Sequence, residues 1–328
     1  MSNLLFHDNN SLMKKIIVYT HADCLLKDNG PNHPERKERL EIIVNSIQEI
    51  KTIDIDIRQA PLADMDIISL VHPEQYIKNI FSLIPSDGLV GMEKEPYADT
   101  LLCPNSRNAI LRSCGAGIAG ANDILYKKEN RIFCAVRPPG HHAETNRANG
   151  FCFINNVAVT ARYLQKKDIQ KIAIIDFDVH HGNGTQEIFY KDSSIAYFSI
   201  HESPLFPGTG SELETGIGNI FNAEIKAGTN STDFIKIFEK KIIKNMDKFK
   251  PEIIIISAGF DAHRNDPLAN INLNSRDFYE LTKLIVEVAN IHSNGKIISF
   301  LEGGYDLNAL SESIKEHFSG LAEKDQAD

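Results

Sequence analysis

The chain has 328 residues, 42% hydrophobic and 24% charged, which is the composition of an ordinary globular protein. Its formal net charge of −9, without a dense basic stretch, argues against direct nucleic-acid binding. No apolar run reaches the length of about 18 residues that a transmembrane helix needs, and residues 1–15 lack the pattern of a secretory signal. We therefore expect a cytoplasmic protein without membrane contact.

Apolar, β-branched segments predict eight strands. In chain order they cover residues 14–20, 54–60, 131–137, 171–178, 195–201, 220–225, 252–260 and 296–304. Several are continuously apolar rather than alternating, which is typical of strands covered on both faces of a parallel sheet.

Helical patterns separate these strands, over residues 33–50, 106–128, 230–249 and 274–296. Their start signals are Pro34, Ser106, Asn230 or Ser231, and Ser275, and Gly295 marks a stop. This alternation predicts an α/β fold: a single three-layer domain over 1–328, with a mostly parallel sheet of about eight strands and helices on both faces. Residues 1–13 and 318–328 are expected to be loose termini.

The five cysteines follow neither zinc-finger nor disulfide spacing. They are odd in number and lie mostly in apolar or mixed surroundings, which favours reduced, mostly buried thiols. They are Cys24, Cys103, Cys114, Cys134 and Cys152.

Titratable side chains follow four of the predicted strands at the point where each strand ends. The segments are "PPGHHAE" (138–144), "DFDVHHGNG" (176–184), "DAHRNDP" (261–267) and Tyr305. Ligands of open α/β sheets bind beyond the carboxyl ends of the strands, so we expect these segments to meet at one rim.

The segment 176–184 predicts a metal site. With strand periodicity Asp178 and His180 point to the same side, and Asp261 after another strand is the natural third ligand. One histidine and two carboxylates that leave a position for water are typical of catalytic zinc. Asp176, on the same side, could orient a histidine. Taken alone, a DxH pattern is usually a surface turn and Asp261 a helix cap, but their placement at matched strand ends favours the metal.

Two further groups predict acid–base chemistry beside the metal. His141 and His142 stand together in a loop restricted by proline and glycine, where one imidazole can act as general base and the other can protonate a leaving group. The phenol of Tyr305 can donate a hydrogen bond to a developing oxyanion. Taken alone, His141 and His142 would be interpreted as a hydrogen-bonded pair in a polar loop, and Tyr305 as a packing residue.

Six segments together resemble the zinc-dependent histone deacetylase-like family, which includes acetylpolyamine amidohydrolases and acetoin-utilisation-type proteins. The segments are "RPPGHHA", "GFCFINNVAV", "IDFDVHHGNGTQEIF", "FPGTG", "SAGFDAH" with "DPLA", and "LEGGY". The resemblance runs from about residue 33 to 310, and "DFDVHHGNGTQ" is similar to the class II-type version.

The resemblance implies an arginase/deacetylase-like fold and a set of site residues. Asp178, His180 and Asp261 would hold Zn²⁺, with Fe²⁺ as the alternative, and Tyr305 would stabilise the transition state. His141 and His142 would be the tandem histidines, oriented by Asp176 and Asn183. Many members have Asp at the position of Asn183, so His142 should lose its proton more easily here.

The resemblance also implies how the substrate is enclosed. Gly150, Phe151 and Phe206 match residues that wall a narrow acyl-lysine tunnel. Arg39 matches an arginine of an internal cavity proposed for acetate exit, and Lys37 replaces the usual proline of that loop. Leu268 occupies a rim position where polyamine-specific members often have an acid.

Family members also bind structural K⁺. The first site would be formed by backbone oxygens around Asp176, Asp178 and His180, with Ser199 nearby. A second cation site would fall near Phe189, Asp192, Ile195 and Asn219, where the side chains depart from the family pattern.

The resemblance thus implies a deacetylase that removes an acetyl or other short acyl group from lysine in proteins, a reading that Leu268 mildly favours. Acetylated polyamines or other small acyl amides are the alternative substrates. An arginase-like ureohydrolase is disfavoured because Gly182 and Gly259 stand where a second metal would need carboxylates. A non-catalytic acyl-lysine-binding scaffold is disfavoured because every chemical position is filled.

Overall fold

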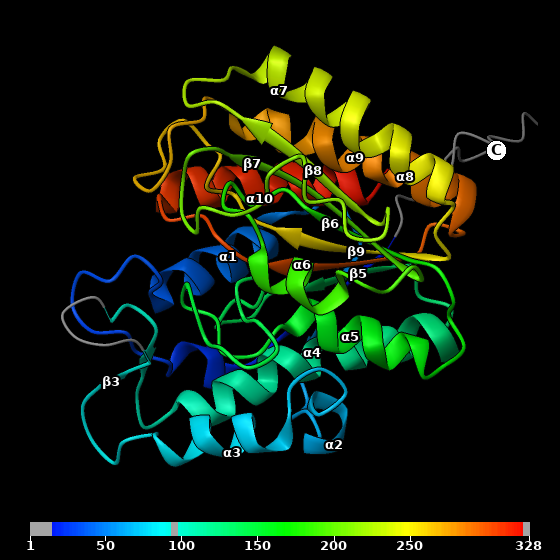
Figure 1. The fold of residues 1–328 in the computed structure, drawn as a ribbon. Helices are drawn as coiled ribbons and strands as arrows, with labels where there is room; N and C mark the ends of the chain where they lie inside the picture. Colours follow the sequence, from blue (N-terminus) through cyan, green and yellow to red (C-terminus); the bar gives the residue numbers. More distant parts are fainter. Residues whose placement is uncertain (1–14, 93–97, 324–328) are drawn as a thin grey trace, which may run out of the picture.

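Eight parallel strands form the central sheet (Figure 1). The computed structural model describes residues 15–92 and 98–323. Across the sheet the order is β2 (Ile55–Gln59), β1 (Ile16–Thr20), β5 (Arg131–Cys134), β10 (Ile297–Leu301), β9 (Ile253–Ala258), β6 (Ile172–Asp176), β7 (Ile195–Glu202) and β8 (Ile220–Ile225). All neighbours pair in parallel. The predicted strands and the α/β fold class are confirmed.

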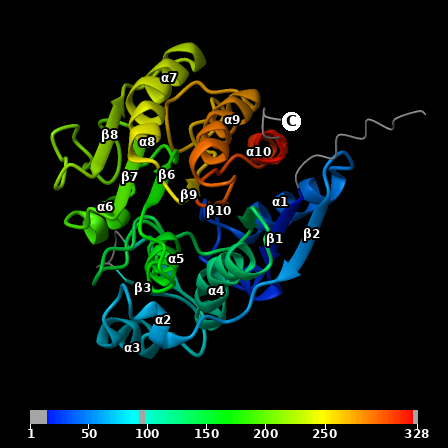
Figure 2. The same cartoon turned by 90° about the vertical axis from the view of Figure 1, so that its right-hand side faces the viewer.

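Helices cover both faces of the sheet (Figure 2). One face carries α1 (Lys37–Glu49), α9 (Ser275–His292), α10 (Leu307–Leu321) and a long helix made of α7 (Ser231–Ile237), the π-helical segment η2 (Phe238–Ile243) and α8 (Lys244–Phe249). The other face carries α4 (Ser106–Tyr126) and α5 (Asn156–Gln165), with α2 (Met65–Ile68) and α3 (Glu74–Ser82) outside them. The remaining elements are η1 (Ala22–Leu25), α6 (Asn183–Phe189) and a small hairpin of β3 (Val90–Gly91) and β4 (Leu101–Leu102).

The apolar core lies where the sheet meets these helices. Every residue of β6, β7 and β9 is buried. Burying one large aliphatic side chain contributes about 1.5–3 kcal/mol, so a continuously apolar strand is stable only between two helical layers. This explains why the strand pattern was readable from the sequence.

Several helix boundaries differ from the prediction. The cap of α9 is Asn274 rather than Ser275, because Asn274 and Asp277 form a reciprocal capping box. Asn230, one of the two candidates, caps α7 by accepting from the backbone N–H of Asp233. Ser106 is already inside α4, and α1 begins at Lys37, beyond Pro34.

The expected loose C-terminal segment from residue 318 is wrong for residues 318–321. These residues belong to α10, and Phe318 and Leu321 are fully buried because α10 packs against α9 and α1. The predicted loose N-terminus, residues 1–13, and residues 324–328 of the predicted loose C-terminus lie outside the described residues.

All five cysteines are buried and free. Within residues 15–92 and 98–323, no helix combines the length and apolar character needed to cross a membrane. The expected cytoplasmic location stays a prediction.

Candidate active site

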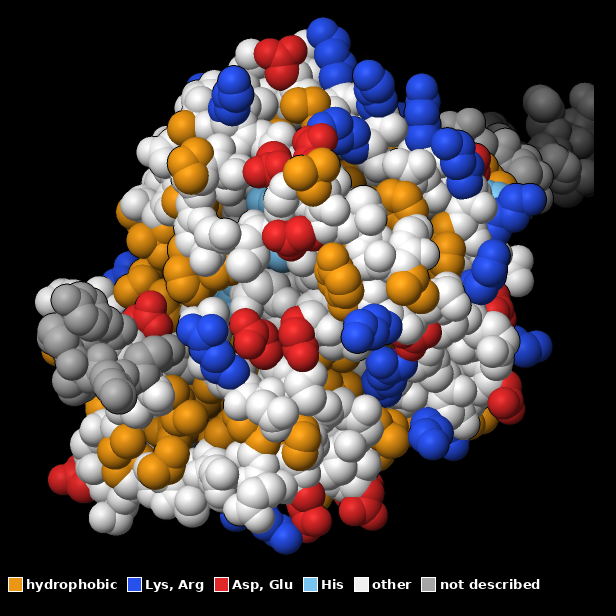
Figure 3. Space-filling view, viewed as in Figure 1, with side chains coloured by type: hydrophobic (Ala, Val, Ile, Leu, Met, Phe, Trp, Pro, Cys, Tyr) orange, Lys and Arg blue, Asp and Glu red, His pale blue; other side chains and the backbone are white. Residues whose placement is uncertain are grey.

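The four chemistry-bearing segments meet because their strands are neighbours. β5, β10, β9 and β6 lie side by side in the sheet, and all four point the same way. Their carboxyl ends therefore open onto one rim, as expected from the sequence. In the space-filling view, histidine side chains are visible in a hollow of this face (Figure 3).

Asp178, His180 and Asp261 form a buried cluster with ligand atoms within 4.8 Å of one another. Nδ1 of His180 lies 3.2 Å from Oδ1 of Asp178 and 3.1 Å from Oδ2 of Asp261. The second oxygens of the two carboxylates accept backbone N–H groups: Gly303 donates to Asp178 at 2.8 Å, and Val179 donates to Asp261 at 2.9 Å. The backbone thus fixes both carboxylates.

This cluster fits a divalent metal ion. Its three buried ligand atoms lie close enough together to contact one ion. Burial and the nearby Asp178 raise the pKa of Asp261, whereas His141 and His180 outweigh burial and hold the pKa of Asp178 below its usual range. One imidazole and two carboxylates suit Zn²⁺ or Fe²⁺. A Cβ on Gly303 would lie 2.1 Å from Oδ2 of Asp261, so only glycine lets the backbone approach this closely.

His141 is held in a carboxylate environment. Its Nδ1 lies 3.1 Å from Oδ2 of Asp176, and the same oxygen accepts the hydroxyl of Tyr197 at 2.9 Å. Burial alone would lower the pKa of His141, but Asp178 and Asp176 outweigh it and raise the pKa to about 10. His141 is therefore placed to carry a proton at neutral pH.

His142 has a different environment, although its ring centroid is only 3.9 Å from that of His141. Its Nδ1 lies 2.8 Å from the amide oxygen of Asn183, whose Nδ2 donates to Glu144 at 2.7 Å. Burial, with the neighbouring His141 and His180, holds the pKa of His142 well below its usual range. The hydrogen bond from Asn183 acts in the opposite direction and raises the pKa, so the expectation drawn from Asn183 stays a prediction. His142 is placed to accept a proton.

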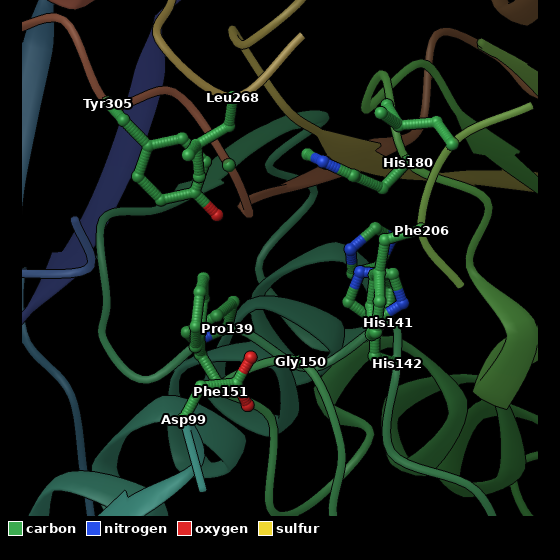
Figure 4. A pocket seen from close by; sticks show the side chains of 12 residues that line it. Asp99, Pro139, His141, His142, Gly150, Phe151, His180, Phe206, Leu268 and Tyr305 are labelled. Atoms are coloured by element: carbon green, nitrogen blue, oxygen red, sulfur yellow. The ribbon is translucent and has the colours of Figure 1, made fainter. Parts of the chain in front are cut away.

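These groups lie at the base of a pocket of about 260 Å³. Phe151 and Phe206 form its walls, and Figure 4 shows the Tyr305 hydroxyl pointing into it. The ring of Phe206 meets His142 edge-on at 5.0 Å, and that of Phe151 meets Tyr305 at 6.2 Å. The lining residues are Asp99, Pro139, His141, His142, Gly150, Phe151, His180, Leu205, Phe206, Leu268, Gly303 and Tyr305. The structure thus brings together every predicted tunnel residue.

The Phe151 wall has an unusual backbone. Phe151 has a φ of +68°, a left-handed conformation that is rare for an aromatic residue. The backbone N–H of Phe151 donates to Oγ1 of Thr100 at 3.1 Å, and His33 packs edge-on against its ring at 4.7 Å. Such conformations persist where surrounding contacts fix them, and they concentrate at binding sites.

Arg39 lies behind Tyr305 rather than in this pocket. Its guanidinium is 4.8 Å from the centre of the Tyr305 ring and donates to the backbone oxygens of Glu302 and Gly304, both at 2.5 Å. It also pairs with Glu35 at 3.3 Å, and Glu35 in turn binds Arg137. Arg39 therefore supports the segment that carries Tyr305.

The two predicted sites for monovalent cations differ in how well their residues suit a cation. Ser199 lies opposite Asp176 in the β6–β7 pairing, and the first cation site stays a prediction.

At the second site, Nδ2 of Asn219 donates to three backbone oxygens, those of Phe189 at 2.8 Å, Ile195 at 2.9 Å and Asp192 at 3.0 Å. The Asn219 amide thus takes the place at the centre of these oxygens, and the residues do not fit a second cation.

Three residues at the site were not singled out from the sequence. Asp99 lines the pocket mouth, Glu144 binds Asn183, and the buried Glu302 accepts the backbone N–H groups of Gly140 and His141 at 2.7 and 3.3 Å. Glu302 alone had a readable signal, because it directly follows a strand within "LEGGY".

The two glycine positions where an arginase-like ureohydrolase would need metal-binding carboxylates have no space for a side chain. A Cβ on Gly259 would lie 2.2 Å from Oδ2 of Asp178, and one on Gly182 would lie 2.3 Å from Oδ2 of Asp176. Neither position has room for a metal-bridging carboxylate.

Comparisons with known proteins agree with this geometry. A family model described as "Histone deacetylase domain" matches residues 33–321. The chain is 33% identical to a "Probable deacetylase" of Archaeoglobus fulgidus, over 88% of this chain and 81% of that protein. It is 34% identical to "Type-2 histone deacetylase 2" of Dictyostelium discoideum over 96% of this chain, but it spans only 21% of that protein.

Two solved structures have the same fold. The "HDA15 HD domain" superposes with a TM-score of 0.86 at 30% identity, covering 94% of this chain and 88% of that chain. An acetylpolyamine aminohydrolase from Burkholderia pseudomallei superposes with a TM-score of 0.83 at 23% identity, covering 93% of this chain and 98% of that chain. The second likeness concerns the fold alone.

Proposed function

Because this chain belongs to the histone deacetylase family of hydrolases, we propose that it removes an acetyl or other short acyl group from the ε-amine of lysine in proteins. The observation that carries the proposal is the convergence of a three-ligand cluster, two differently tuned histidines and a tyrosine hydroxyl at the base of one aromatic-walled pocket.

Asp178, His180 and Asp261 would hold Zn²⁺, or Fe²⁺ in its place. When bound, such an ion polarises an amide carbonyl and makes water a nucleophile near neutral pH. K⁺ at the first cation site, beside Asp176, Asp178, His180 and Ser199, would have a structural role.

The chain's own side chains handle the protons. His142, whose pKa is low, takes the proton of the attacking water. His141, whose pKa is about 10, donates a proton to the departing amine. Tyr305 donates a hydrogen bond to the carbonyl oxygen as negative charge develops there. Burial raises the pKa of Tyr305 well above its usual range, so the phenol keeps the proton it must donate.

The pocket suits a thin aliphatic stem that ends in a flat amide. The rings of Phe151 and Phe206 face the pocket from two sides and exclude water along the stem. At the rim, Leu268 offers only apolar contact.

The position of Asp99 supports acetylated polyamines as a second substrate class. Its carboxylate lies at the pocket mouth, where it could accept backbone N–H groups of a peptide or pair with the distant ammonium of an acetylated polyamine. The lack of an acid at position 268 therefore does not make the rim free of acids, and acetylpolyamine hydrolysis is the alternative function.

The decisive experiment compares initial rates of the Zn²⁺-loaded protein on an acetyl-lysine peptide and an acetylpolyamine, each with and without chelator. Faster, chelator-sensitive acetate release from the peptide supports the proposal, and preference for the polyamine supports the alternative. Absence of turnover with both contradicts the amidohydrolase function.

Asp99→Asn refines the result. It should weaken polyamine binding through loss of charge, whereas it should affect a peptide less because an amide oxygen still accepts hydrogen bonds. Asp178→Asn serves as the metal-deficient control on both substrates.

A further inference from the structure

Glu302 occupies an unusual place for a carboxylate. It directly follows β10, is 1% exposed, and forms no ion pair with a lysine, arginine or histidine of residues 15–92 and 98–323 within 4.0 Å. Taking a carboxylate out of water costs several kcal/mol unless other groups compensate. Burial accordingly raises the pKa of Glu302, to about 7. The contacts of Glu302 therefore have to account for a buried carboxylate at this position.

Both oxygens of Glu302 are used. Oε2 accepts the backbone N–H of Gly140 at 2.7 Å and that of His141 at 3.3 Å, and Oε1 accepts the hydroxyl of Ser257 at 3.2 Å. A carboxyl oxygen can accept backbone N–H groups in either protonation state, so these contacts do not depend on the charge of Glu302. Glu302 therefore ties the loop that carries the tandem histidines to the ends of β9 and β10.

The same contact completes the restraints on His141. Its ring faces Asp176, its backbone oxygen accepts the N–H of Thr185 at 3.2 Å, and its backbone N–H is bound by Glu302. Without Glu302, the N-terminal side of His141 would lose its hydrogen-bond acceptor, and the adjacent Gly140 would lose it as well.

The segment 302–305 also connects this loop to the rest of the site. Gly303 donates to the ligand Asp178, the backbone oxygens of Glu302 and Gly304 are held by Arg39, and Tyr305 reaches the pocket. One clamped segment thus fixes the histidine loop, a metal ligand and the tyrosine relative to one another.

We propose that Glu302 is a positioning residue for the reaction, which holds the Gly140–His141 backbone so that the His141 ring stays in line with the substrate amide. The kinetic part of this inference rests on the proposed function. Glu302 itself does not line the pocket and touches no reacting atom.

Three variants separate the possible roles of Glu302. Glu302→Ala removes the acceptor, Glu302→Gln keeps an oxygen for Gly140 and His141 but removes the charge, and Ser257→Ala leaves the loop contacts intact as a matched control. Misplacement of a catalytic group by about 1 Å can cost 10²-fold in rate. We expect Glu302→Ala to lower kcat by about 10- to 100-fold, with KM within about twofold and metal content unchanged.

Glu302→Gln should recover most of kcat, and Ser257→Ala should stay near wild type. A second readout does not depend on turnover: amide hydrogen exchange at Gly140 and His141 should accelerate in Glu302→Ala and remain slow in Glu302→Gln. Wild-type kcat in Glu302→Ala, or unchanged exchange at both amides, would overturn the inference. If the wild-type protein hydrolyses neither substrate, the proposed function fails while the exchange data still decide the role of Glu302.

Discussion

Nδ1 of His142 lies 2.8 Å from the amide oxygen of Asn183, whereas the adjacent His141 faces the carboxylate of Asp176. The pKa values of these two neighbouring histidines shift in opposite directions: burial, with His141 and His180, lowers that of His142, whereas Asp178 and Asp176 raise that of His141. In the proposed mechanism this difference divides the acid and base roles between His141 and His142, and a substitution at Asn183 can alter it.

Asn183→Asp should make His142 easier to protonate, because a carboxylate stabilises the imidazolium and an amide does not. The pH at which kcat/KM falls on the acidic side should rise by about one unit or more. The measurement is a pH–rate profile of metal-loaded protein.

The new carboxylate would also lie close to Glu144, which binds Asn183. The double variant Asn183→Asp with Glu144→Gln controls for this repulsion. An unchanged acidic limb in both variants would mean that His142 is not the base.

Tyr305→Phe should lower kcat by about 10²- to 10³-fold, because the oxyanion loses a preorganised donor in a buried site. Metal content and fold should be unchanged, as checked by elemental analysis and thermal melting. Tyr76→Phe is the matched control, since the hydroxyl of this buried tyrosine donates to the backbone of Phe153 instead. Full activity of Tyr305→Phe would remove the tyrosine from the mechanism.

Glu35 should contribute to acid sensitivity of the fold. Burial alone would raise its pKa, but Arg137 and Arg39 outweigh burial and lower the pKa from 4.5 to about 2. Because the folded-state pKa is the lower one, the stabilisation is present above about pH 4.5 and is lost as pH falls toward 2, with a size of about 3 kcal/mol.

Urea unfolding of Glu35→Gln at pH 7 and pH 3 should therefore show a smaller pH dependence than the wild type. Glu74→Gln, a change at an exposed glutamate paired with Lys78, should leave the dependence unchanged. If the free energy of unfolding changed equally between pH 7 and pH 3 in Glu35→Gln and in the wild type, the lowered pKa of Glu35 would be contradicted.

Asn219→Ala should leave three backbone oxygens without their donor and destabilise the protein by about 1–3 kcal/mol. The vacated oxygens form a cradle for a monovalent cation, so K⁺ should raise the melting temperature of the variant more than that of the wild type. KCl and choline chloride at equal ionic strength make the comparison.

Asn222→Ala controls for this experiment, since Asn222 is a nearby buried asparagine, in strand β8 just after Asn219, that donates mainly to Gln186. A K⁺ response shared equally by all three proteins would show that the Asn219 oxygens take no cation.

The parts of the fold predicted from the sequence are those that a single local pattern determines. Apolar, β-branched runs predicted all eight strands of the central sheet, though not the two-residue strands β3 and β4. The residues just beyond β6 and β9 predicted the cluster that could hold a metal ion, since parallel strands end at a common edge. Helices such as α5 and α10 were not predicted. Both begin within or directly after segments that were interpreted as family motifs, so their helical periodicity was not considered.

Contacts between distant segments were beyond the sequence. Nothing local to Asp99 indicates that it lies at the mouth of a pocket whose other residues lie beyond position 138. Likewise, the amide of Asn219 reaches three backbone oxygens of the α6–β7 connection and its ends, a contact that only the folded chain defines.

The order of strands has a consequence for synthesis on the ribosome. β10 is the last of the eight sheet strands in chain order, yet it lies between β5 and β9 in the middle of the sheet. Before residues 297–301 emerge, the nascent chain has two half-sheets, β2–β1–β5 and β9–β6–β7–β8, each with an unpaired apolar edge. Asp178 then lacks the N–H of Gly303, so the site is completed only when β10 pairs, and until then the two unpaired apolar edges favour aggregation.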